Sequence, residues 1–273
     1  MAIITISREL ATLGDETAQA LAKLLNYRLI DKYVIEERIK SFGVAYQKFE
    51  KFDEKKPSFW ASLSRDRDDY LHFLKSAIFA EACGGNAVFI GRGAGIILKG
   101  VPGVFSVFLA APMETRLERV KKHFHCDDKR ARQIIEHSDN DWEGFHNSFF
   151  ETKWGDPGNY HLALNTGYLT PDFCAEIVKY MRDKILTQEA DTENILRIRE
   201  LTLGQEIKYR TLYERKIPIH FFEASVSGSH VVLYGVANSQ SLIETAISLA
   251  AEMAPELVIQ SEIQVVQEYT VLP

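Results

Sequence analysis

The chain has 273 residues, of which 46% are hydrophobic and 11% aromatic, and its net charge at pH 7 is −6. This length and composition are enough for one large core and a smaller second domain, and they exclude a disordered chain. The negative charge also excludes the broad cationic surface with which proteins usually bind nucleic acid. A small phosphorylated ligand remains compatible with it.

The cysteines and the apolar segments place the chain among intracellular proteins. Cys83, Cys126 and Cys174 are far apart and form no CxxC pair, so we expect buried thiols rather than a disulfide framework or a zinc site. No uninterrupted apolar run approaches the roughly 18 residues of a membrane span, and no leader pattern opens the chain. These features predict a soluble, cytoplasmic protein.

The first 188 residues alternate strand and helix patterns. Residues 2–6 predict a buried strand, and apolar residues on one face of 18–25 predict the helix that follows. The later elements are expected at 27–30 (strand), 33–39 (helix), 87–91 (strand), a glycine-rich turn with a helix to 99, 104–110 (strand), 113–124 (helix), 128–138 and 140–151 (helices), 160–165 (strand) and 171–186 (helix). Strands separated by helices predict a parallel sheet of five strands with helices on both faces.

Residues 41–82 interrupt this alternation. They read as irregular helix with many aromatic residues set among charges. Such an insertion is typical of a mobile flap over a substrate, and it is equally typical of a dimer face.

The polar stretch "TQEADTEN" predicts a linker at 189–196, and the residues after it form a second unit, 197–273. From residue 190 onward there are six Lys and Arg against eleven Asp and Glu, a net charge of −5, which leaves −1 for residues 1–189. The patterns in this unit predict a helix over 197–214, a hairpin, a helix that begins at Asn238 or Ser239, and a final strand over 257–266. The unit is therefore a small αββαβ domain.

The segment after the first strand is placed like a phosphate-binding loop. Such a loop reads G-x-x-x-x-G-K-[ST]: its backbone N–H groups hold the phosphates, its lysine reaches the outer two, and its hydroxyl binds Mg²⁺. When Gly14 and Thr17 are aligned with the end of the related pattern G-x-x-G-x-G-K-G-T, Glu9 takes the first glycine position. Asp15 takes the lysine position and Glu16 the next glycine position.

Asp15 is the main departure from the motif. Two unit charges about 4 Å apart interact by roughly 4 kcal/mol at an effective dielectric of 20, so an acid in place of the lysine should weaken phosphate binding strongly. Alternatively, Asp15 and Glu16 simply favour the positive end of a helix dipole. Arg8 could act as the substitute cation. Thr17 could be a magnesium ligand or an ordinary residue of the first helical turn.

Together with "NYRLIDK", "VFIGRGAGIIL", "VFLAAPMETRLERV" and "KWGDPGNYHLALNTGYL", the first 188 residues resemble the cytidylate-kinase-like family of P-loop nucleoside monophosphate kinases. The resemblance implies ATP with Mg²⁺ at the first loop and CMP or dCMP under a helical flap, residues 41–82. It also implies a lid, residues 126–153, that covers the transferred phosphoryl group.

The same resemblance suggests residues for the monophosphate side and for the lid. Asp31 lies where the family closes its second strand beside the monophosphate, and Arg92 lies where an arginine grips it. Arg116 and Arg119 lie in the helix before the lid, and arginine suits this role because its planar fork binds phosphate oxygens in pairs. The other readings are a helix cap for Asp31, an ion pair for Arg92, and solvated helix faces for Arg116 and Arg119.

The lid also departs from the family. Where a D-K-x-R pattern is expected, the chain reads Asp139, Asn140, Asp141, Trp142, so both lid cations are missing. Phosphoryl transfer depends on positioning and on cations around the transferred group. The triphosphate side is therefore expected to be disabled, and the catalytic residues stay unknown, with Arg8, Arg116, Arg119 and Lys153 as candidates.

The second unit resembles a BON domain, through "VVLYGVANSQSLIETAISLAAEM" and "VIQSEIQVV". This resemblance implies binding to a surface or another domain, and it adds no catalytic residue.

Three functions stay open. The first is a nucleotide sensor that binds a pyrimidine nucleotide with weak or no kinase activity. The second is an active (d)CMP kinase that uses unfamiliar cations such as Arg8, Lys153 or a residue from a partner subunit. The third is a scaffold that binds a protein partner, or a second copy, through 41–82 or the second unit.

Overall fold

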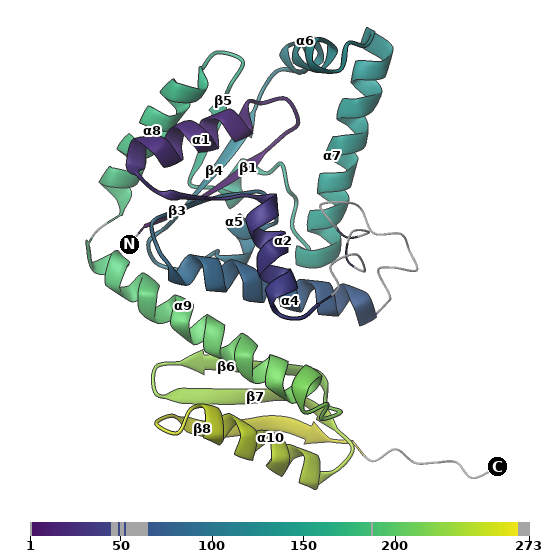
Figure 1. Ribbon diagram of the computed structural model, residues 1–273, viewed down its shortest axis with the longest axis vertical. Coiled ribbons are helices and arrows are strands. Elements are labelled where there is room, and N and C mark those ends of the chain that lie inside the picture. Colours follow the sequence, from purple (N-terminus) through teal and green to yellow (C-terminus); the bar gives the residue numbers. More distant parts are fainter. Residues whose placement is uncertain (1, 45–48, 50–51, 53–64, 187, 267–273) are drawn as a thin grey trace, which may run out of the picture. The chain divides into compact units, whose positions relative to one another are not determined.

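The computed structural model describes residues 2–44, 49, 52, 65–186 and 188–266. The chain divides into two compact units, 1–195 and 196–273 (Figure 1). No helix among the residues listed here is long and apolar enough to cross a membrane. The division into the domains 1–188 and 197–273 stays a prediction, although the unit boundary falls within the expected linker.

Unit 1 is built on a five-stranded parallel sheet with the order β2-β3-β1-β4-β5. Its strands are β1 (Ile3–Arg8), β2 (Arg28–Ile30), β3 (Ala87–Ile90), β4 (Val104–Ala110) and β5 (Leu162–Asn165). Its helices are α1 (Gly14–Leu25), α2 (Lys32–Ser41), α4 (Arg65–Cys83), α5 (Ala94–Ile97), α6 (Met113–Phe124), α7 (Asp128–Phe150), the 3-10 turn Pro157–Asn159 and α8 (Pro171–Ile185). The predicted fold class is confirmed.

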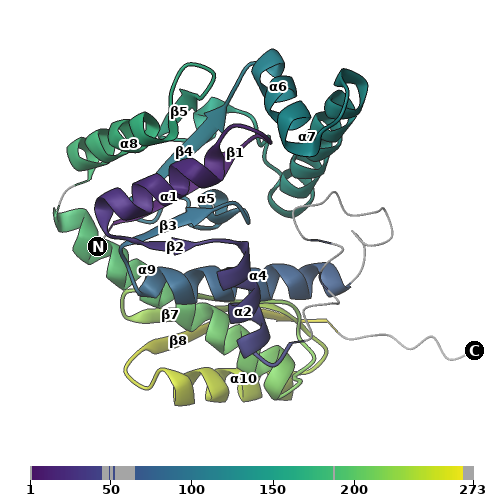
Figure 2. The same cartoon turned by 45° about the horizontal axis from the view of Figure 1, so that its top comes forward.

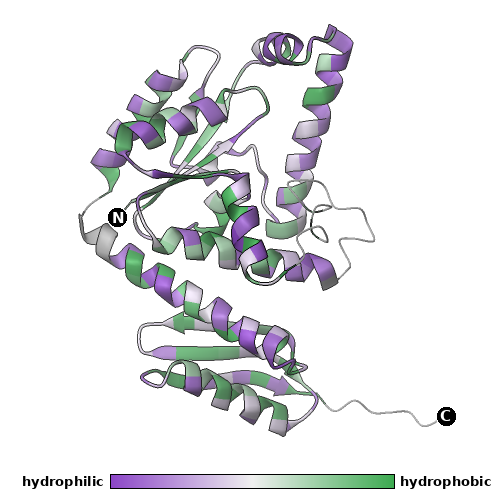
Figure 3. Ribbon diagram, in the orientation of Figure 1, coloured by the Kyte–Doolittle hydropathy of each residue, from purple (hydrophilic) through white to green (hydrophobic). Residues whose placement is uncertain are grey.

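Helices cover both faces of this sheet because its strands are apolar on both sides. Ile4, Ile6 and Val107 point to α1 and α8, whose Leu21 and Val178 complete that core layer. The helices α4 and α5 lie on the opposite face (Figure 2). In Figure 3 the strands are mostly hydrophobic, whereas α6 is mostly hydrophilic.

Two helix predictions in unit 1 were wrong. Residues 128–138 and 140–151 form one helix, α7, rather than two. Asp139 does not break the helix, because its carboxylate is bound by Arg116 instead of capping a new helix. The helix expected up to residue 99 is also shorter, since α5 ends at Ile97.

The aromatic residues of the insertion that can be described pack within the chain. Phe52 and Tyr70 are fully buried, and their rings lie 5.9 and 5.4 Å from the ring of Phe149 in α7. Phe49 and Phe73 are also buried. The expectation of a flap or dimer face also rests on Phe59 and Trp60, which lie outside the described residues.

The cysteine expectation holds only in part. The three cysteines are free, and Cys174 is buried, which raises the pKa of its thiol. Cys83, however, is exposed and Cys126 is half-buried. The prediction of three buried thiols was therefore wrong.

Unit 2 has a three-stranded sheet with the order β6-β7-β8, in which β6 and β7 are antiparallel and β7 and β8 are parallel. Its elements are α9 (Gln188–Tyr209), which begins in unit 1, the π-helical turn Arg210–Glu214, β6 (His220–Ser227), β7 (His230–Ala237), α10 (Gln240–Met253) and β8 (Val258–Val265). The linker predicted at 189–196 is helical and forms part of α9. The predicted αββαβ order is therefore present.

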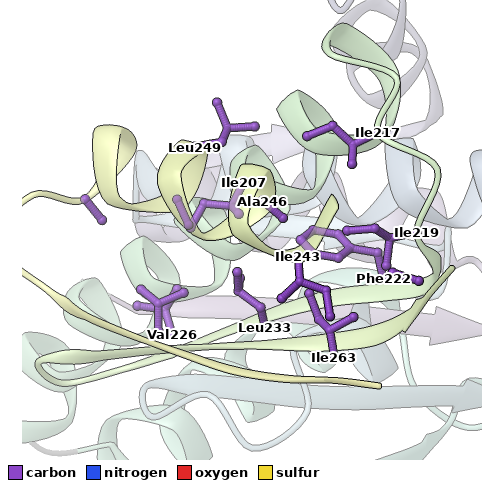
Figure 4. Packing of buried hydrophobic residues seen from close by; sticks show 14 residues of the cluster. Ile207, Ile217, Ile219, Phe222, Val226, Leu233, Ile243, Ala246, Leu249 and Ile263 are labelled. Atoms are coloured by element: carbon purple, nitrogen blue, oxygen red, sulfur yellow. The ribbon is translucent and has the colours of Figure 1, made fainter. Parts of the chain in front are cut away.

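The core of unit 2 lies between this sheet and its helices. Ile243 and Ala246 of α10 face Leu233 and Ile263 of the sheet, and Ile207 of α9 joins them (Figure 4). The apolar face predicted for α10 from its spacing is thus the face that is buried.

Candidate functional site

The loop after β1, residues 9–13, turns through two left-handed residues that are not glycine. Ala11 and Leu13 have positive φ angles of 62° and 56°, a region that favours glycine. The first backbone bond inside α1 runs from Thr17 N to Leu13 O, so the N–H groups of residues 14–16 have no helical partner. Leu13 at the N-cap supplies no side-chain bond to them. This turn is a backbone arrangement that favours an anion.

The side chains around this turn are acidic or already paired. The Asp15 side chain is 71% exposed, and its carboxylate lies 3.6 Å from Nη2 of Arg8. The Arg8 stem crosses Gly14, since a Cβ on Gly14 would lie 2.5 Å from Arg8 Cγ. The Arg8 guanidinium also stacks 4.6 Å above the ring of Trp142. Arg8 therefore lies beside the lysine position of the motif.

Thr17, the candidate magnesium ligand, is fully buried, and its hydroxyl donates to the carbonyl of Leu13 at 2.7 Å. Among the residues that can be described, no group of three or more His, Cys, Asp and Glu side chains is placed to hold a metal.

Arg116 and Arg119 of α6 bind the loop itself. Arg116 Nε donates to the carbonyl of Leu10 at 2.9 Å, and Arg119 Nη1 donates to the carbonyl of Ala11 at 3.0 Å. Arg119 also donates to the hydroxyl and the carbonyl of Thr166. The alternative reading of Arg116 as part of a solvated helix face was wrong, because its side chain is only 4% exposed.

Arg116 is held by two carboxylates as well. It lies 2.6 Å from Asp139 and 3.4 Å from Glu9. Burial raises the pKa of the Glu9 carboxyl, an effect that Arg116 and the Ala111 amide partly offset. The charge of Arg116 is thus already balanced within the protein.

The loop is also a packing surface. Leu10 and Ala11 pack against a small apolar cluster of α6 and α7, formed by Val120, Ala131 and Ile135. The hairpin of α6 and α7, which is the lid region of the sequence analysis, is therefore fastened to the loop by apolar contacts and by arginine bonds.

The turn after β3 forms a second part of the site at the same end of the sheet. Gly91, Arg92 and Gly93 all have positive φ angles, of 74°, 57° and 67°. Arg92 is almost fully buried, and its Nη2 lies 3.3 Å from Glu36 of α2. Asp31 caps α2 by accepting bonds from Tyr33 N and Val34 N at 2.9 and 3.1 Å. Arg92 and Asp31 thus make the structural contacts considered from the sequence, which leaves their roles toward a ligand as predictions.

The loop after α7 contributes an aromatic wall. Trp154 is buried, and its ring lies 5.1 Å from that of Trp142 and 5.6 Å from that of Phe108. Burial lowers the pKa of the neighbouring His146 to about 4, and its ring bonds the Trp142 carbonyl at 2.8 Å. The carbonyl of Lys153 accepts bonds from Asp156 N and Asn159 Nδ2. These are backbone contacts, so a catalytic role for the Lys153 side chain stays a prediction.

Sequence reasoning missed three residues of this arrangement. Glu36 gave no motif signal, because an ion pair between distant elements has no local spacing. Thr166 lies in the motif "KWGDPGNYHLALNTGYL", but that motif assigned it no role. Trp142 was noticed only as the absence of a lid cation, although an aromatic ring at that position can hold an arginine.

Unit 1 is therefore an open α/β fold with the sheet order β2-β3-β1-β4-β5, and the loop after its central strand lies at the carboxyl edge, where such sheets bind their ligands. A sequence model of the Cytidylate kinase-like family matches residues 3–168, and the chain belongs to this family.

Several solved structures are similar to this chain, and the first of them shares the fold of unit 1. An uncharacterized protein from Eubacterium ventriosum is 23% identical with a TM-score of 0.52, and the match covers 67% of this chain and 99% of that one. Shikimate kinase from Aquifex aeolicus is 17% identical (TM-score 0.36, covering 67% and 97%), and a gluconokinase from Sinorhizobium meliloti is 14% identical (TM-score 0.40, covering 67% and 95%). No curated protein matches the chain.

Proposed function

We propose that this chain binds a pyrimidine nucleotide and transfers phosphoryl groups weakly or not at all, so that it acts as a nucleotide sensor. The observation that carries the proposal is the use of Arg116 and Arg119, which donate to the carbonyls of Leu10 and Ala11. A cation that holds the loop from its carbonyl side is not directed at a phosphate on its amide side.

The triphosphate side supports this proposal. Asp15 occupies the lysine position, and Glu9 and Asp139 bring two more carboxylates to the loop. The Thr17 hydroxyl is bound to Leu13 O, so a metal would have to displace that bond. These side chains do not fit a magnesium-bound triphosphate, and we derive no transfer step through one.

The monophosphate side is less altered. Arg92 remains at the end of β3 on a left-handed turn, and its Nη2 lies 3.3 Å from the carboxylate of Glu36. An arginine in this setting can exchange a carboxylate for a phosphate, because both present two oxygens to the guanidinium fork. We therefore expect CMP or dCMP to bind more tightly than ATP.

The second candidate is an active kinase, which the position of Arg8 favours. Its guanidinium lies 3.6 Å from Asp15, so a cation is present beside the lysine position although the lysine is not. A phosphate would have to compete with Asp15 for it.

The C-terminal unit is proposed to be a BON-like interaction module. Its αββαβ order supports this assignment. In the sensor hypothesis this unit passes the bound state to a protein partner, and in the scaffold hypothesis either this unit or residues 41–82 binds the partner.

A coupled assay with ATP and Mg²⁺, and with CMP, dCMP, UMP and AMP as acceptors, tests the proposal. We expect turnover far below the roughly 1–100 s⁻¹ of typical kinases. Turnover in that range that is lost in Arg8→Ala and in Arg92→Ala would establish the kinase instead.

Thermal unfolding with each nucleotide then separates the sensor from the scaffold. A ligand at 100 times its dissociation constant should stabilise the fold by about 2.7 kcal/mol. We expect this shift with CMP or dCMP and its loss in Arg92→Ala. No shift with any nucleotide would leave the scaffold function.

A further inference from the structure

The two edges of the C-terminal sheet differ in how they are protected. At the β6 edge, Arg197 of α9 donates to the Val226 carbonyl at 3.0 Å, and Glu200 accepts from Gly228 N at 2.7 Å. Gly204 lies so close that a Cβ on it would be 2.4 Å from the Ala224 carbonyl oxygen. A register shift between His220 and Glu223 interrupts this edge further. Helix α9 and the irregularity together block strand pairing at β6.

The β8 edge has none of these protections. β8 is eight residues long and pairs with β7 in unbroken register, and no other strand among the described residues pairs with it. It contains no lysine, proline or bulge, features that usually prevent edge pairing, and its one charged residue is Glu262. Val258 and Val265 at its ends are 52% and 45% exposed.

The backbone groups that point outward from β8 can be assigned. Val258 N donates to Ser229 O and Val266 N donates to Ala237 O, so the even-numbered residues direct their N–H groups toward β7. Because the register is unbroken, the odd-numbered residues direct theirs to the open edge. Ile263 agrees with this assignment, since its N–H donates to the Ser261 hydroxyl at 3.3 Å rather than to β7.

We propose that the occupant of this edge is β8 of a second copy of the chain, antiparallel, with a two-fold axis at Ser261. In an antiparallel pair that uses the outward groups, odd residues must face odd residues. The two registers that pair the most residues place the axis at Ser261 or at Glu262.

Charge distinguishes these two registers. With the axis at Glu262, the two Glu262 carboxylates face each other at a non-hydrogen-bonded position, where the Cα atoms lie only about 4.5 Å apart. With the axis at Ser261, Glu262 faces Gln260 of the partner twice, and Ile259 faces Ile263 twice. The second arrangement pairs an amide donor with a carboxylate and isoleucine with isoleucine.

The assembly would be a closed dimer with a continuous six-stranded sheet. A two-fold axis uses the same patch on both copies, so no β8 edge remains open. Because α9 and the irregularity block the β6 edges, the sheet would not grow further.

Sedimentation equilibrium of the full chain tests the proposal, with Gln260→Glu and Gln264→Glu as matched variants. Both side chains are exposed and both substitutions add one negative charge on the same strand. Gln260→Glu would face Glu262 twice in the dimer, whereas residue 264 faces Val258. We expect Gln260→Glu to raise the dimer dissociation constant by about tenfold or more, and Gln264→Glu by less than about threefold.

Gln260→Lys should lower that dissociation constant, because it places a cation opposite Glu262. A wild-type chain that is monomeric up to its solubility limit would overturn the proposal. Equal changes of the dissociation constant in the two glutamate variants would also overturn the proposal. A dimer whose dissociation constant changes in neither variant would overturn it too, because the second copy would then bind in another register or at another surface.

Discussion

The loop after β1 and the turn after β3 lie at the same end of one sheet and have kept different parts of a nucleotide site. The first loop presents the N–H groups at the start of α1 that have no helical partner, with left-handed Ala11 and Leu13 where glycine would be unstrained. Its side chains, however, are acidic or bound to the loop itself. The second turn retains both its glycines and its arginine, Arg92.

This difference shows that the two loops are held in their conformations by different contacts. Contacts from α6 and α7 impose the conformation at Ala11, through Arg119 and the apolar cluster. The turn at Arg92 depends instead on the absence of Cβ atoms. The first loop should therefore be sensitive to changes in its neighbours, and the second to changes in its own residues.

Arg116→Ala should have the largest effect on stability. The substitution removes a buried arginine and leaves Glu9 and Asp139 facing each other without it. Breaking a buried pair costs about 3–5 kcal/mol, and because both carboxylates are partly exposed we expect about 3 kcal/mol. Urea denaturation measures this change. Arg130→Ala, at an exposed position of the next helix, should stay within about 0.5 kcal/mol, and a similar loss in both variants would contradict the account.

His146 should make stability fall on acidification. Its folded pKa of about 4 is below the unfolded value near 6.5, so its contribution is complete above pH 6.5 and is lost as the pH falls toward 4. A difference of this size corresponds to about 3 kcal/mol. Unfolding free energies measured from pH 7 to pH 4 should fall less steeply in His146→Gln than in the wild type. Asn147→Gln, an uncharged substitution at an exposed position of the same helix, should keep the wild-type slope.

Gly93→Ala should destabilise the second turn by about 2–3 kcal/mol, through backbone strain and a clash. The φ of Gly93 is 67°, and a Cβ there would lie 2.7 Å from the Phe150 ring. Gly100 provides the matched control, because its φ is 79° and no atom lies near a Cβ built on it. Gly100→Ala should cost only about 1 kcal/mol. Equal costs would show that the Phe150 contact is unimportant.

Ala11→Gly should have the smallest effect. Relief of a left-handed alanine gains about 1 kcal/mol, and the greater freedom of glycine in the unfolded chain costs about 0.5–1 kcal/mol. We expect a change in unfolding free energy within about 0.5 kcal/mol by urea denaturation. A large loss would mean that the Ala11 methyl group, rather than the neighbouring arginines, holds the loop in place.

The sequence predicted the fold well because the fold depends on local patterns. The β-branched run at the start of β1 and the apolar face of α10 both occupy their expected places. The break expected near residue 139 was wrong, because Asp139 is bound by an arginine 23 residues away. No local pattern contains that contact.

The candidate site was predictable only as a list of residues. Spacing identified Asp15, Arg92, Arg116 and Arg119, yet it could not show that Arg116 and Arg119 bind loop carbonyls rather than a ligand. That outcome depends on how α6 packs on the loop, through Leu10 and Ala11. A phosphate-binding loop is usually rich in glycine. The apolar residues Leu10 and Ala11 at these positions were therefore a signal in the sequence that the loop packs against a neighbouring helix.

Isothermal titration with Mg²⁺ and a non-hydrolysable ATP analogue tests the central claim, that the turn before α1 carries the Asp15 carboxylate where a phosphate-binding loop has its lysine. Asp15→Lys restores the cation, and Glu16→Lys makes the same change of charge at the neighbouring exposed position. We predict weak or undetectable binding by the wild type and at least about tenfold tighter binding by Asp15→Lys, with a smaller gain for Glu16→Lys. These gains are smaller than the full Coulomb energy, because the side chains at both positions are exposed to solvent. Wild-type binding as tight as that of Asp15→Lys would contradict the account.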